Sequence, residues 1–390
     1  MMFKRFYTKS PSERRQILEA DGARNLNDLA GIPNAEIETL DRMSENVIGA
    51  WRLPLGVVPQ FTVNKKCHRI AMATEEPSVI AAVNRISKLI NACQEGIHCS
   101  FDSPVTMAQI SGTVSLAQAN VFKQIINQNK AQWLSLANEQ NPQLAELGGG
   151  AFDIQLEILP PEWNELWRET FVIFKLYVHT LDAMGANAVN TMAEALLRYI
   201  ENEYVFFTPC MAIVSNASEG RLVHASIDIP FAILEEITGM PGSNFAMLIA
   251  RASALADRCP ERAVTHNKGI LNGIIAAAIP LGQDTRAIQA AAYDYACKTG
   301  VHLPLVRWNM SSKSLHGEMH IPLPIGSVGG LRKIPAVNAA FAFDKIDNYA
   351  ELCSVLAGVG MTQNLGALWA LTTEGIQAGH MKLHHRKGSV

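Results

Sequence analysis

Two adjacent carboxylates stand directly before a helix-forming stretch of the chain. Glu75 and Glu76 precede Pro77, and from Val79 onward apolar residues recur at helical spacing. Proline suits the first turn of a helix, and the helix dipole stabilises acidic groups at that end. Taken alone, the pair favours a solvated first turn, although a partly buried carboxyl at this place could instead donate a proton.

A cluster of polar side chains interrupts a largely apolar region further along the chain. Its members fall within eleven residues: Arg262, Thr265, His266, Asn267, Lys268 and Asn272. A lysine here could polarise a carbonyl group or stabilise an oxyanion, and Arg262 could bind a carboxylate through two hydrogen bonds. Lys268 with the apolar run after it could also mark a simple helix start, but the density of polar groups favours a functional site.

Two further segments place small residues at helix starts. Asp284, within residues 282–286, has the type and position of a helix N-cap, and it could also pair with Lys268. Residues 182–187 lead into a helix whose N-terminus could hold a pyrophosphate. This turn lacks the GxGxxG pattern, so we expect no ordinary Rossmann motif. Alone, the first segment favours a structural cap and the second is a weak signal.

One histidine stands out near the C-terminal end of the chain. His380 lies in the string Gly379-His380-Met381, at the end of a helical stretch. A lone histidine at such a place is more often a helix cap or a solvent-exposed residue. A catalytic role therefore does not follow from this residue by itself.

The composition excludes several classes of protein. Of the 390 residues, 48% are hydrophobic and 18% are charged, which is typical of a globular protein with a sizeable core. The formal net charge of −3 gives no basic surface, so we expect no nucleic-acid partner. The most apolar run, residues 269–281, is too short to cross a bilayer, and the N-terminus is polar and basic. We therefore expect no membrane contact and no secretory signal.

The spacing of cysteine and histidine argues against disulfides and bound metal. The seven cysteines include no CxxC pair, a pattern that indicates reduced thiols in a cytoplasmic protein. The eleven histidines include no HExxH motif and no zinc-type pairing with cysteine, so we predict no metal site.

The elements that must position these residues follow from the periodicity of the sequence. Residues 152–158 alternate between apolar and polar types, which predicts a half-buried strand. Residues 171–178 and 206–214 predict two more strands, separated by a helix that opens at about Asn187. This order predicts a small α+β unit inserted in a larger, mostly helical domain.

We therefore expect an α+β fold whose large domain is divided in sequence. The expected parts are a first large-domain segment at residues 1–102, a small domain at 103–215, a second large-domain segment at 216–376 and a C-terminal segment at 377–390. In the second large-domain segment the patterns predict strands at 222–229 and 316–321, and helices at 243–256, at 286–297 and, broken by a turn at 344–348, at 336–380.

Together, the motifs resemble those of soluble, class II hydroxymethylglutaryl-CoA (HMG-CoA) reductases. Five strings occur in the order in which that family has them: Glu45-Asn-Val-Ile-Gly49, Glu75-Glu76-Pro-Ser78, Asp182-Ala-Met-Gly-Ala-Asn187, Thr265-His-Asn-Lys-Gly269 and Gly379-His-Met381. The likeness runs from about Leu40 to the C-terminus, and chance occurrence of five such strings in order is negligible.

The resemblance implies both an architecture and an activity. The large domain would be interrupted by a small NAD(P)-binding domain, and two chains would form a homodimer with active sites at the subunit interface. The family reduces HMG-CoA to mevalonate and CoA with two hydrides from NAD(P)H, or runs the reverse reaction.

Four residues match the catalytic positions of that family. Glu76 resembles the proton donor, Lys268 the group that polarises the carbonyl, and Asp284 the aspartate that modulates the lysine. His380 resembles the histidine that protonates the departing CoA thiolate. These types suit the chemistry, because a buried ammonium stabilises the thioester oxygen as hydride arrives and a nearby acid helps the thiolate to leave.

Binding residues carry over by the same motifs. Residues that match contacts of the hydroxymethylglutaryl group or of CoA are Ser78, Arg262, Asn272 and Gln363. Residues that match contacts of the nicotinamide cofactor are Asp153, Asp182, Met184, Gly185, Asn187 and Asn216. Asp153 resembles an aspartate that contacts the adenosine ribose. A carboxylate there accepts hydrogen bonds from a free 2′-hydroxyl and repels a 2′-phosphate, so the resemblance favours NADH over NADPH.

The sequence departs from the family pattern at two places. Tyr7 and Lys9 stand where the family has an arginine that contacts CoA, and the chain continues only ten residues beyond His380. Related enzymes carry that histidine on a longer mobile flap, so residues 377–390 are expected to form a shortened flap.

Two alternatives to an active reductase stay open. One is a catalytically impaired homodimer that binds CoA but lacks a complete flap, although the retention of all four catalytic candidates argues against it. The other is an oxidoreductase that acts on a different acyl-CoA. The presence of Arg262 and Ser78 favours the hydroxymethylglutaryl group as the substrate instead. The sequence leaves open whether mevalonate is made or broken down.

Overall fold

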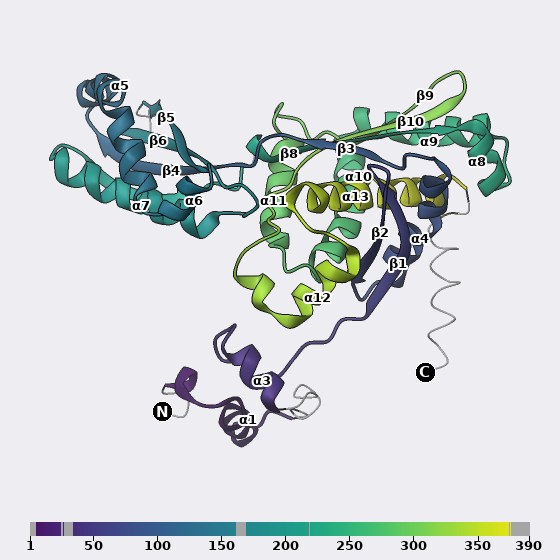
Figure 1. The fold of residues 1–390 in the computed structure, drawn as a ribbon, viewed down its shortest axis with the longest axis horizontal. Helices are drawn as coiled ribbons and strands as arrows, with labels where there is room; N and C mark the ends of the chain where they lie inside the picture. Colours follow the sequence, from purple (N-terminus) through teal and green to yellow (C-terminus); the bar gives the residue numbers. More distant parts are fainter. Residues whose placement is uncertain are drawn as a thin grey trace. The chain divides into compact units, whose positions relative to one another are not determined.

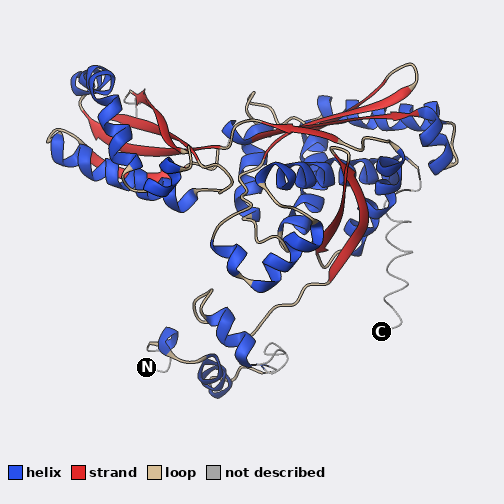
Figure 2. Ribbon diagram, in the orientation of Figure 1, coloured by secondary structure: helices blue, strands red, loops and turns tan. Residues whose placement is uncertain are grey.

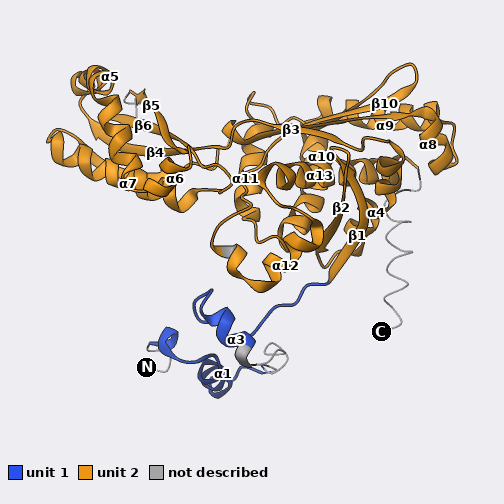
Figure 3. Cartoon of the chain, in the orientation of Figure 1, with its two compact units in different colours: residues 1–54 blue, residues 55–390 orange. Residues whose placement is uncertain are grey.

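The chain folds into two compact units. The computed structural model describes residues 5–24, 26, 34–160, 169–217, 219–373 and 375. Unit 1 comprises residues 1–54 and unit 2 comprises residues 55–390 (Figure 3).

Unit 1 is built from short helices, namely η1 (Phe6–Thr8), α1 (Pro11–Ala20) and α3 (Asn34–Asp41). A capping box starts α1, because Ser10 Oγ accepts the N–H of Glu13 and the Glu13 carboxylate accepts the N–H of Ser10 at 2.7 Å. These two bonds satisfy N–H groups that the first turn of a helix leaves unpaired.

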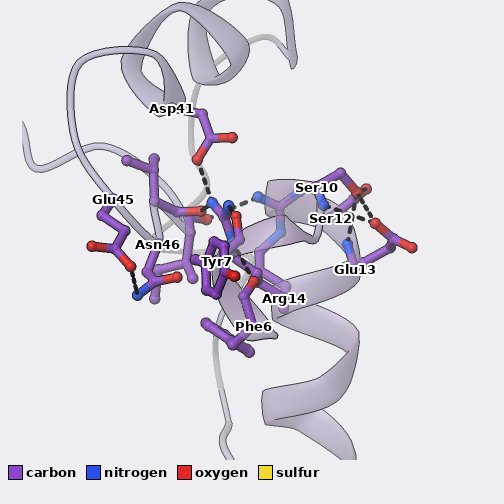
Figure 4. Close-up of polar contacts among 12 residues, drawn as sticks. Phe6, Tyr7, Ser10, Ser12, Glu13, Arg14, Asp41, Glu45 and Asn46 are labelled. Atoms are coloured by element: carbon purple, nitrogen blue, oxygen red, sulfur yellow. Dashed lines mark hydrogen bonds and ion pairs between the residues drawn. The ribbon is translucent and has the colours of Figure 1, made fainter. Parts of the chain in front are cut away.

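Arg14 of α1 holds unit 1 together (Figure 4). Its side chain is 3% exposed, donates to the carbonyls of Phe6, Tyr7 and Val47, and pairs with Asp41. A buried guanidinium is stable only when its donors are satisfied. These bonds therefore tie the segment around Val47, which belongs to the first of the five motifs, to α1.

Unit 2 contains two hydrophobic cores. The elements around the first core are β1 (Leu55–Val63), β2 (Lys66–Ala73), α4 (Pro77–Ala92), β3 (His98–Phe101), β8 (Leu222–Pro230), α8 (Phe231–Thr238), α9 (Gly242–Arg258), α10 (Pro260–Ala278), α11 (Thr285–Ala296), β9 (Val306–Met310), β10 (Ser314–Pro322), α12 (Pro335–Asp344) and α13 (Tyr349–Thr372). Those around the second are β4 (Val105–Val114), α5 (Leu116–Asn138), α6 (Pro142–Glu146), β5 (Gly150–Leu159), β6 (Thr170–His179), α7 (Ala186–Glu203) and β7 (Thr208–Val214). Two short 3-10 turns, η2 (Glu219–Arg221) and η3 (Gly330–Lys333), complete the described elements (Figure 1).

The described strands of unit 2 form three antiparallel sheets (Figure 2). β1 and β2 pair as a hairpin, and the strand orders of the two larger sheets are β3-β8-β10-β9 and β5-β6-β4-β7. In the second core, α5 and α7 pack against the β5-β6-β4-β7 sheet and against each other. The turn between β6 and α7 therefore lies at the end of a sheet strand, where the sheet and helix fix its position.

The central helix of the first core is α13. It is buried along almost its whole length, as expected for a helix whose apolar residues occur on all sides. At Gly360, a Cβ would lie 2.7 Å from Ile274 Cδ1 of α10, so the close packing of these helices requires glycine. α13 also packs against α4. One core helix thus fixes both α10, which carries Lys268, and α4, which follows Glu76.

The α+β fold is confirmed, and most predicted elements exist. β5, β6, α7 and β7 occupy the places predicted for the small unit, and β4 and α5 accompany them without having been predicted. The boundaries at residues 103 and 215 stay a prediction, since the chain divides into compact units between residues 54 and 55. No described helix is long and apolar enough to cross a membrane.

The start of α10 differs from the simplest interpretation of its sequence. The helix begins at Pro260, which occupies the first helical position after Cys259 in extended conformation. The whole polar cluster of residues 262–272 therefore lies inside the helix, and Lys268 does not mark its start. Two members of the cluster, His266 and Asn267, are buried and bond to the backbone of residues 303–306, so they have a structural role.

Candidate active site

A cleft of about 510 Å³ opens in unit 2 among three segments of the chain. Its lining consists of Ala183, Met184, Gly185, Ala186, Asn187, Ala188, Leu281, Gly282, Gln283, Asp284, Arg286, Gly326, Val328, Gly329, Gly330 and Arg332. The first segment leads into α7 and the second into α11. Four of the predicted site residues, Met184, Gly185, Asn187 and Asp284, therefore line one cleft.

Gly185 shapes the turn that enters α7. It is the N-cap of the helix and has a φ of 84°, in the left-handed region that favours glycine. A Cβ at this position would lie 2.3 Å from Thr180 Cγ2, so a side chain would displace the turn. Because the first N–H groups of a helix have no acceptor within it, the start of α7 offers hydrogen-bond donors to the cleft.

Arg221 lies behind this turn and fixes its carbonyl groups. The side chain is 1% exposed, and its guanidinium donates to the carbonyls of Ala183 at 3.0 Å and of Met184 at 2.9 Å. Further acceptors for the same guanidinium are Thr106 Oγ1, Thr180 Oγ1 and the Ile325 carbonyl. Burial lowers the pKa of Arg221, but guanidinium groups stay charged in proteins. A buried cation thus fixes the carbonyls of the turn that lines the cleft.

Asp182 joins the turn to two other parts of the first core. Its carboxylate accepts the N–H of Tyr349 at 3.2 Å, at the first residue of α13, and its carbonyl accepts the N–H of Ser327 at 2.8 Å. The side chain lies beside the cleft rather than in its lining. Asp182 therefore positions the turn through α13 and the 326–332 loop.

Gln283 links the two loops that face the turn. Its Nε2 donates to the Gly326 carbonyl at 3.0 Å, and its Oε1 accepts the Gly326 N–H at 2.9 Å. Gly326 in turn packs on the peptide before Met184, where a Cβ would lie 2.4 Å from the Met184 nitrogen. The loop that carries Asp284 is therefore connected through Gln283 and Gly326 to the turn before α7.

Asp284 is the N-cap of α11, as its position predicts. One carboxylate oxygen, Oδ1, accepts the N–H groups of Arg286 at 3.0 Å and Ala287 at 3.1 Å. The other, Oδ2, lies 3.2 Å from the Arg286 guanidinium, and the side chain is 35% exposed. The capping bonds fix the carboxylate while leaving it accessible from the cleft, so the structural and the functional interpretation are compatible.

Glu76 has a comparable capping role at α4. Its Oε1 accepts the N–H of Ser78 at 3.1 Å, and its side chain is half-buried whereas that of Glu75 is exposed. Ser78 is also half-buried, in the first turn of the helix. Of the two adjacent carboxylates, Glu76 is therefore the one whose position is fixed at the start of α4.

Lys268 lies on α10, one turn before Asn272. With the Asn272 amide turned so that its oxygen faces the lysine, that oxygen lies 3.1 Å from Lys268 Nζ, and the amide nitrogen lies 3.2 Å from the Lys268 carbonyl. Residues four apart share one face of a helix, so the two act together. Lys268 is exposed in the single chain, and Arg262 on the same helix is half-buried.

Gln363 faces α10 from α13. It is 5% exposed, and a Cβ on Gly273 would lie 2.7 Å from Gln363 Cβ, so the two helices touch at this point. Its Oε1 is buried without a hydrogen-bond partner. A buried amide oxygen of this kind lacks an interaction worth about 1–3 kcal/mol, which a bound ligand could provide.

Asp153 lies on β5 next to a β-bulge and does not line the cleft. Its carboxylate pairs with Lys130 of α5 and accepts bonds from Gln155 Nε2 at 2.9 Å and from the Ile154 N–H at 2.8 Å. Burial by itself would raise the pKa of Asp153, but the bonds from Lys130 and Gln155 outweigh it and lower that pKa. The group is therefore a carboxylate at neutral pH.

Comparison with known proteins identifies the family. A family model described as hydroxymethylglutaryl-coenzyme A reductase matches residues 10–385. The chain belongs to this family. The 3-hydroxy-3-methylglutaryl-coenzyme A reductase of Archaeoglobus fulgidus is 37% identical over 91% of this chain and 78% of its own length. A probable 3-hydroxy-3-methylglutaryl-coenzyme A reductase of Borreliella burgdorferi is 30% identical over 98% of this chain and 86% of its own length.

Solved structures of HMG-CoA reductases have the same fold. The class II enzyme from Streptococcus pneumoniae, bound to NADPH in open conformations, matches with a TM-score of 0.80 at 32% identity, over 95% of this chain and 100% of that one. The resemblance inferred from the five motifs is therefore confirmed, as is the class of activity, an NAD(P)H-dependent oxidoreductase with CoA as substrate or product.

The predicted HMG-CoA reductase residues fall into separate places in the structure. Glu76 and Ser78 lie at the start of α4, whereas Lys268, Arg262 and Asn272 lie on α10. Asn216 is exposed just after β7. None of these lines the cleft. His380 lies outside the described residues, as does the predicted flap at 377–390, and exposed Tyr7 and Lys9 belong to unit 1.

Several residues that shape the cleft were not singled out by the sequence. Arg221 and Gly326 belong to no local motif, because their roles come from contacts with residues far away in the chain. Gln283 and Arg286 stand beside Asp284 in a segment in which the sequence pointed to Asp284 alone, as a helix cap and as a partner of Lys268. Among the described residues, no group of His, Cys, Asp and Glu side chains could hold a metal ion.

Proposed function

We propose that this chain interconverts HMG-CoA and mevalonate plus CoA, with the nicotinamide dinucleotide held in the cleft. The observation that carries this proposal is that the turn before α7 and the loop bearing Asp284 line the same cleft. A dinucleotide bound along the turn would lie beside the carboxylate that the family motif marks as catalytic.

The residues of the cleft suit a dinucleotide. The start of α7 supplies N–H donors for a pyrophosphate, and Gly185 allows the backbone to approach it closely. Arg286 and Arg332 add positive charge to the lining. When bound, the nicotinamide supplies or accepts the hydride, while the protein orients it. The dinucleotide is proposed to contact Met184, Gly185 and Asn187. Asp182 and Asn216 are proposed to contact it as well.

Four residues carry the proposed chemistry. Lys268 polarises the thioester carbonyl, held in place by Asn272, and Asp284 keeps the lysine cationic. Glu76 donates a proton to the developing alcohol. His380 protonates the CoA thiolate as it leaves. Each assignment rests on the match to a family motif and on the side-chain type.

Four residues are proposed to hold the rest of the substrate. Arg262 binds the carboxylate of the hydroxymethylglutaryl group, and Ser78 and Asn272 bind its oxygens. Gln363 contacts CoA. The unsatisfied Oε1 of Gln363 supports its role, because a donor from the ligand would complete its hydrogen bonding.

We propose that the active form is a homodimer with interfacial active sites. The exposure of Lys268 in the single chain supports this proposal. An ammonium group stabilises a developing oxyanion strongly only where water is excluded. A second copy of the chain placed over α10 would exclude that water.

We propose that NADH is preferred to NADPH. The support is Asp153, whose lowered pKa keeps it ionised and able to accept hydrogen bonds from ribose hydroxyls. Lys130 pairs with this carboxylate and offsets part of its charge, so the discrimination against a 2′-phosphate is modest. Asp153→Asn should lower the NADH/NADPH ratio of kcat/KM, and an unchanged ratio would exclude Asp153 as the cause.

We also propose a cytoplasmic location and no bound metal. The seven cysteines are all free thiols, which suits a reducing compartment. Metal analysis of the purified protein tests the second part: stoichiometric zinc or iron that is needed for turnover would refute it.

The test of this function is nicotinamide absorbance during turnover of the full-length protein. HMG-CoA with NADH or NADPH should oxidise the cofactor, and mevalonate with CoA and the oxidised cofactor should reduce it. A folded protein that binds CoA without turnover in either direction would refute the proposal and favour the impaired homodimer. Substitution of HMG-CoA by other acyl-CoA thioesters checks the choice of substrate.

A further inference from the structure

Arg286 is an exposed cation in the lining of the cleft, and no motif assigns it a contact of its own. It is the second residue of α11, and its side chain is 88% exposed. Its guanidinium donates to Asp284 Oδ2 at 3.2 Å. The residue thus faces the space proposed for the dinucleotide while it holds the carboxylate proposed to modulate Lys268.

We propose that Arg286 binds the phosphate oxygens of the dinucleotide and releases Asp284 when it does so. The inference rests on the proposed function, because it requires that the cleft is the cofactor site. It adds a phosphate-binding residue to that site and a coupling between cofactor binding and the catalytic carboxylate.

The contact between Arg286 and Asp284 is suited to exchange. Ion pairs between exposed side chains contribute little stability, so the guanidinium can leave the carboxylate readily. Arginine pairs with phosphate through two charge-assisted hydrogen bonds, which makes a pyrophosphate a stronger partner than one carboxylate oxygen. The first turn of α11 places the long side chain in the same cleft as the start of α7, where N–H groups offer further donors to that anion.

Asp284 keeps its position when Arg286 leaves. Its Oδ1 is held by the N–H groups of Arg286 and Ala287, which belong to the backbone of α11 and do not depend on the guanidinium. Only Oδ2 loses its partner. The carboxylate is thereby freed to act on Lys268 at the moment when the cofactor is in place.

Arg332 is a different kind of cation in the same cleft. Its guanidinium lies over the Phe341 ring, 4.0 Å from the centroid. The partner of Arg332 is therefore an aromatic ring, whereas that of Arg286 is Asp284. Removal of Arg332 should weaken phosphate binding without changing the state of Asp284. The two arginines therefore separate the two parts of the proposal.

The first test measures binding of ADP-ribose, which carries the pyrophosphate but lacks the nicotinamide. We expect Arg286→Gln to raise the Kd measured by calorimetry about tenfold or more, and to reduce the dependence of Kd on salt. Arg286→Lys keeps the charge without the planar donors, so its Kd should lie between those of wild type and Arg286→Gln. Arg198→Gln is the matched control, because Arg198 is an exposed arginine on α7 outside the cleft, 4.0 Å from Glu194.

The second test separates binding from release of the carboxylate. With saturating HMG-CoA, Arg286→Gln should raise KM for the cofactor, and the pH profile of kcat should be retained, because Asp284 is then permanently free. Arg332→Gln should raise KM for the cofactor in the same way. An unchanged Kd for ADP-ribose in Arg286→Gln would overturn the phosphate contact, and a shifted pH profile of kcat would overturn the release of Asp284.

The outcomes distinguish this inference from the function on which it rests. If wild-type protein neither binds ADP-ribose nor turns over HMG-CoA, the proposed function fails and the inference fails with it. If wild-type protein does both and folded Arg286→Gln binds ADP-ribose within twofold of wild type, only the inference is overturned. Circular dichroism of each variant establishes that it is folded.

Discussion

At the scale of single residues, buried polar groups determine much of the behaviour of unit 2. Asp344, the last residue of α12, is fully buried and accepts the N–H of Ala71 at 2.9 Å, while its second carboxylate oxygen has no partner. Burial raises the pKa of Asp344 to about 7, and the hydrogen bond from Ala71 offsets only part of that shift. The group is therefore half-protonated near neutral pH in the folded protein.

This raised pKa predicts that stability falls as pH rises. Between the unfolded pKa of 3.8 and the folded pKa of about 7, the folded state binds more protons than the unfolded state. The free energy of unfolding should therefore decrease through this window, by on the order of a few kcal/mol from Asp344. Asp344→Asn should be more stable than wild type at pH 8, with a smaller difference at pH 4. Denaturant unfolding at both pH values measures the difference in stability between the variant and wild type. A difference that does not depend on pH would contradict the raised pKa of Asp344.

Gly326 gives a second prediction at the residue scale. Gly326→Ala would place a Cβ 2.4 Å from the Met184 nitrogen and push the turn before α7. We expect KM for NADH to rise about tenfold. Gly330→Ala is the control, since it also lines the cleft but its Cβ would meet nothing within 4 Å. Equal effects of the two substitutions would show that the packing on Met184 does not matter.

At the scale of elements, the cleft depends on connections among a strand end, two loops and a helix start. Arg221 joins the end of β6, the turn before α7 and the segment at Ile325 through one guanidinium. Gln283 joins the start of α11 to the 326–332 loop. These connections join side chains and backbone groups that lie far apart in sequence. A substitution of Arg221 or Gln283 should therefore affect the turn and the loops together.

Arg221→Met tests this connection. The substitution removes a buried donor from several buried acceptors, so we expect the free energy of unfolding to fall by about 2–5 kcal/mol. KM for NADH should rise in the fraction that folds. Arg198→Met, at an exposed position on α7, should change the stability by less than about 0.5 kcal/mol. Thermal unfolding of both variants measures the loss of stability. A loss for Arg221→Met no larger than that for Arg198→Met would contradict the connecting role of Arg221.

At the scale of the whole molecule, the sequence predicted those features that depend on short segments. The strand at β5, Pro77 at the start of α4 and the cap at Asp284 all have local causes and are confirmed. The alternation predicted for β5 is wrong at Phe152, which is exposed beside the bulge between Ala151 and Asp153. Arg221 and Gly326 could not be predicted, because their roles come from contacts across unit 2. The family could be predicted only because five motifs occur in order, since most of them taken singly favour a structural explanation.

The homodimer is the prediction that concerns the whole assembly. Lys268 is exposed in one chain, and the proposed homodimer places a second copy over it to exclude water. Light scattering should give a dimer or a larger even-numbered oligomer at the concentrations used for assay. Activity that stays constant per chain while dilution produces monomers would contradict interfacial active sites.

Hydride transfer by Lys268→Ala tests the central claim most directly, because the cofactor is proposed to bind in the cleft and Lys268 to act on the substrate from α10. The variant should bind NADH within about twofold of the wild-type Kd and transfer hydride to HMG-CoA at least about 10²–10³-fold more slowly in a single turnover. A transfer rate close to that of wild type would contradict the account.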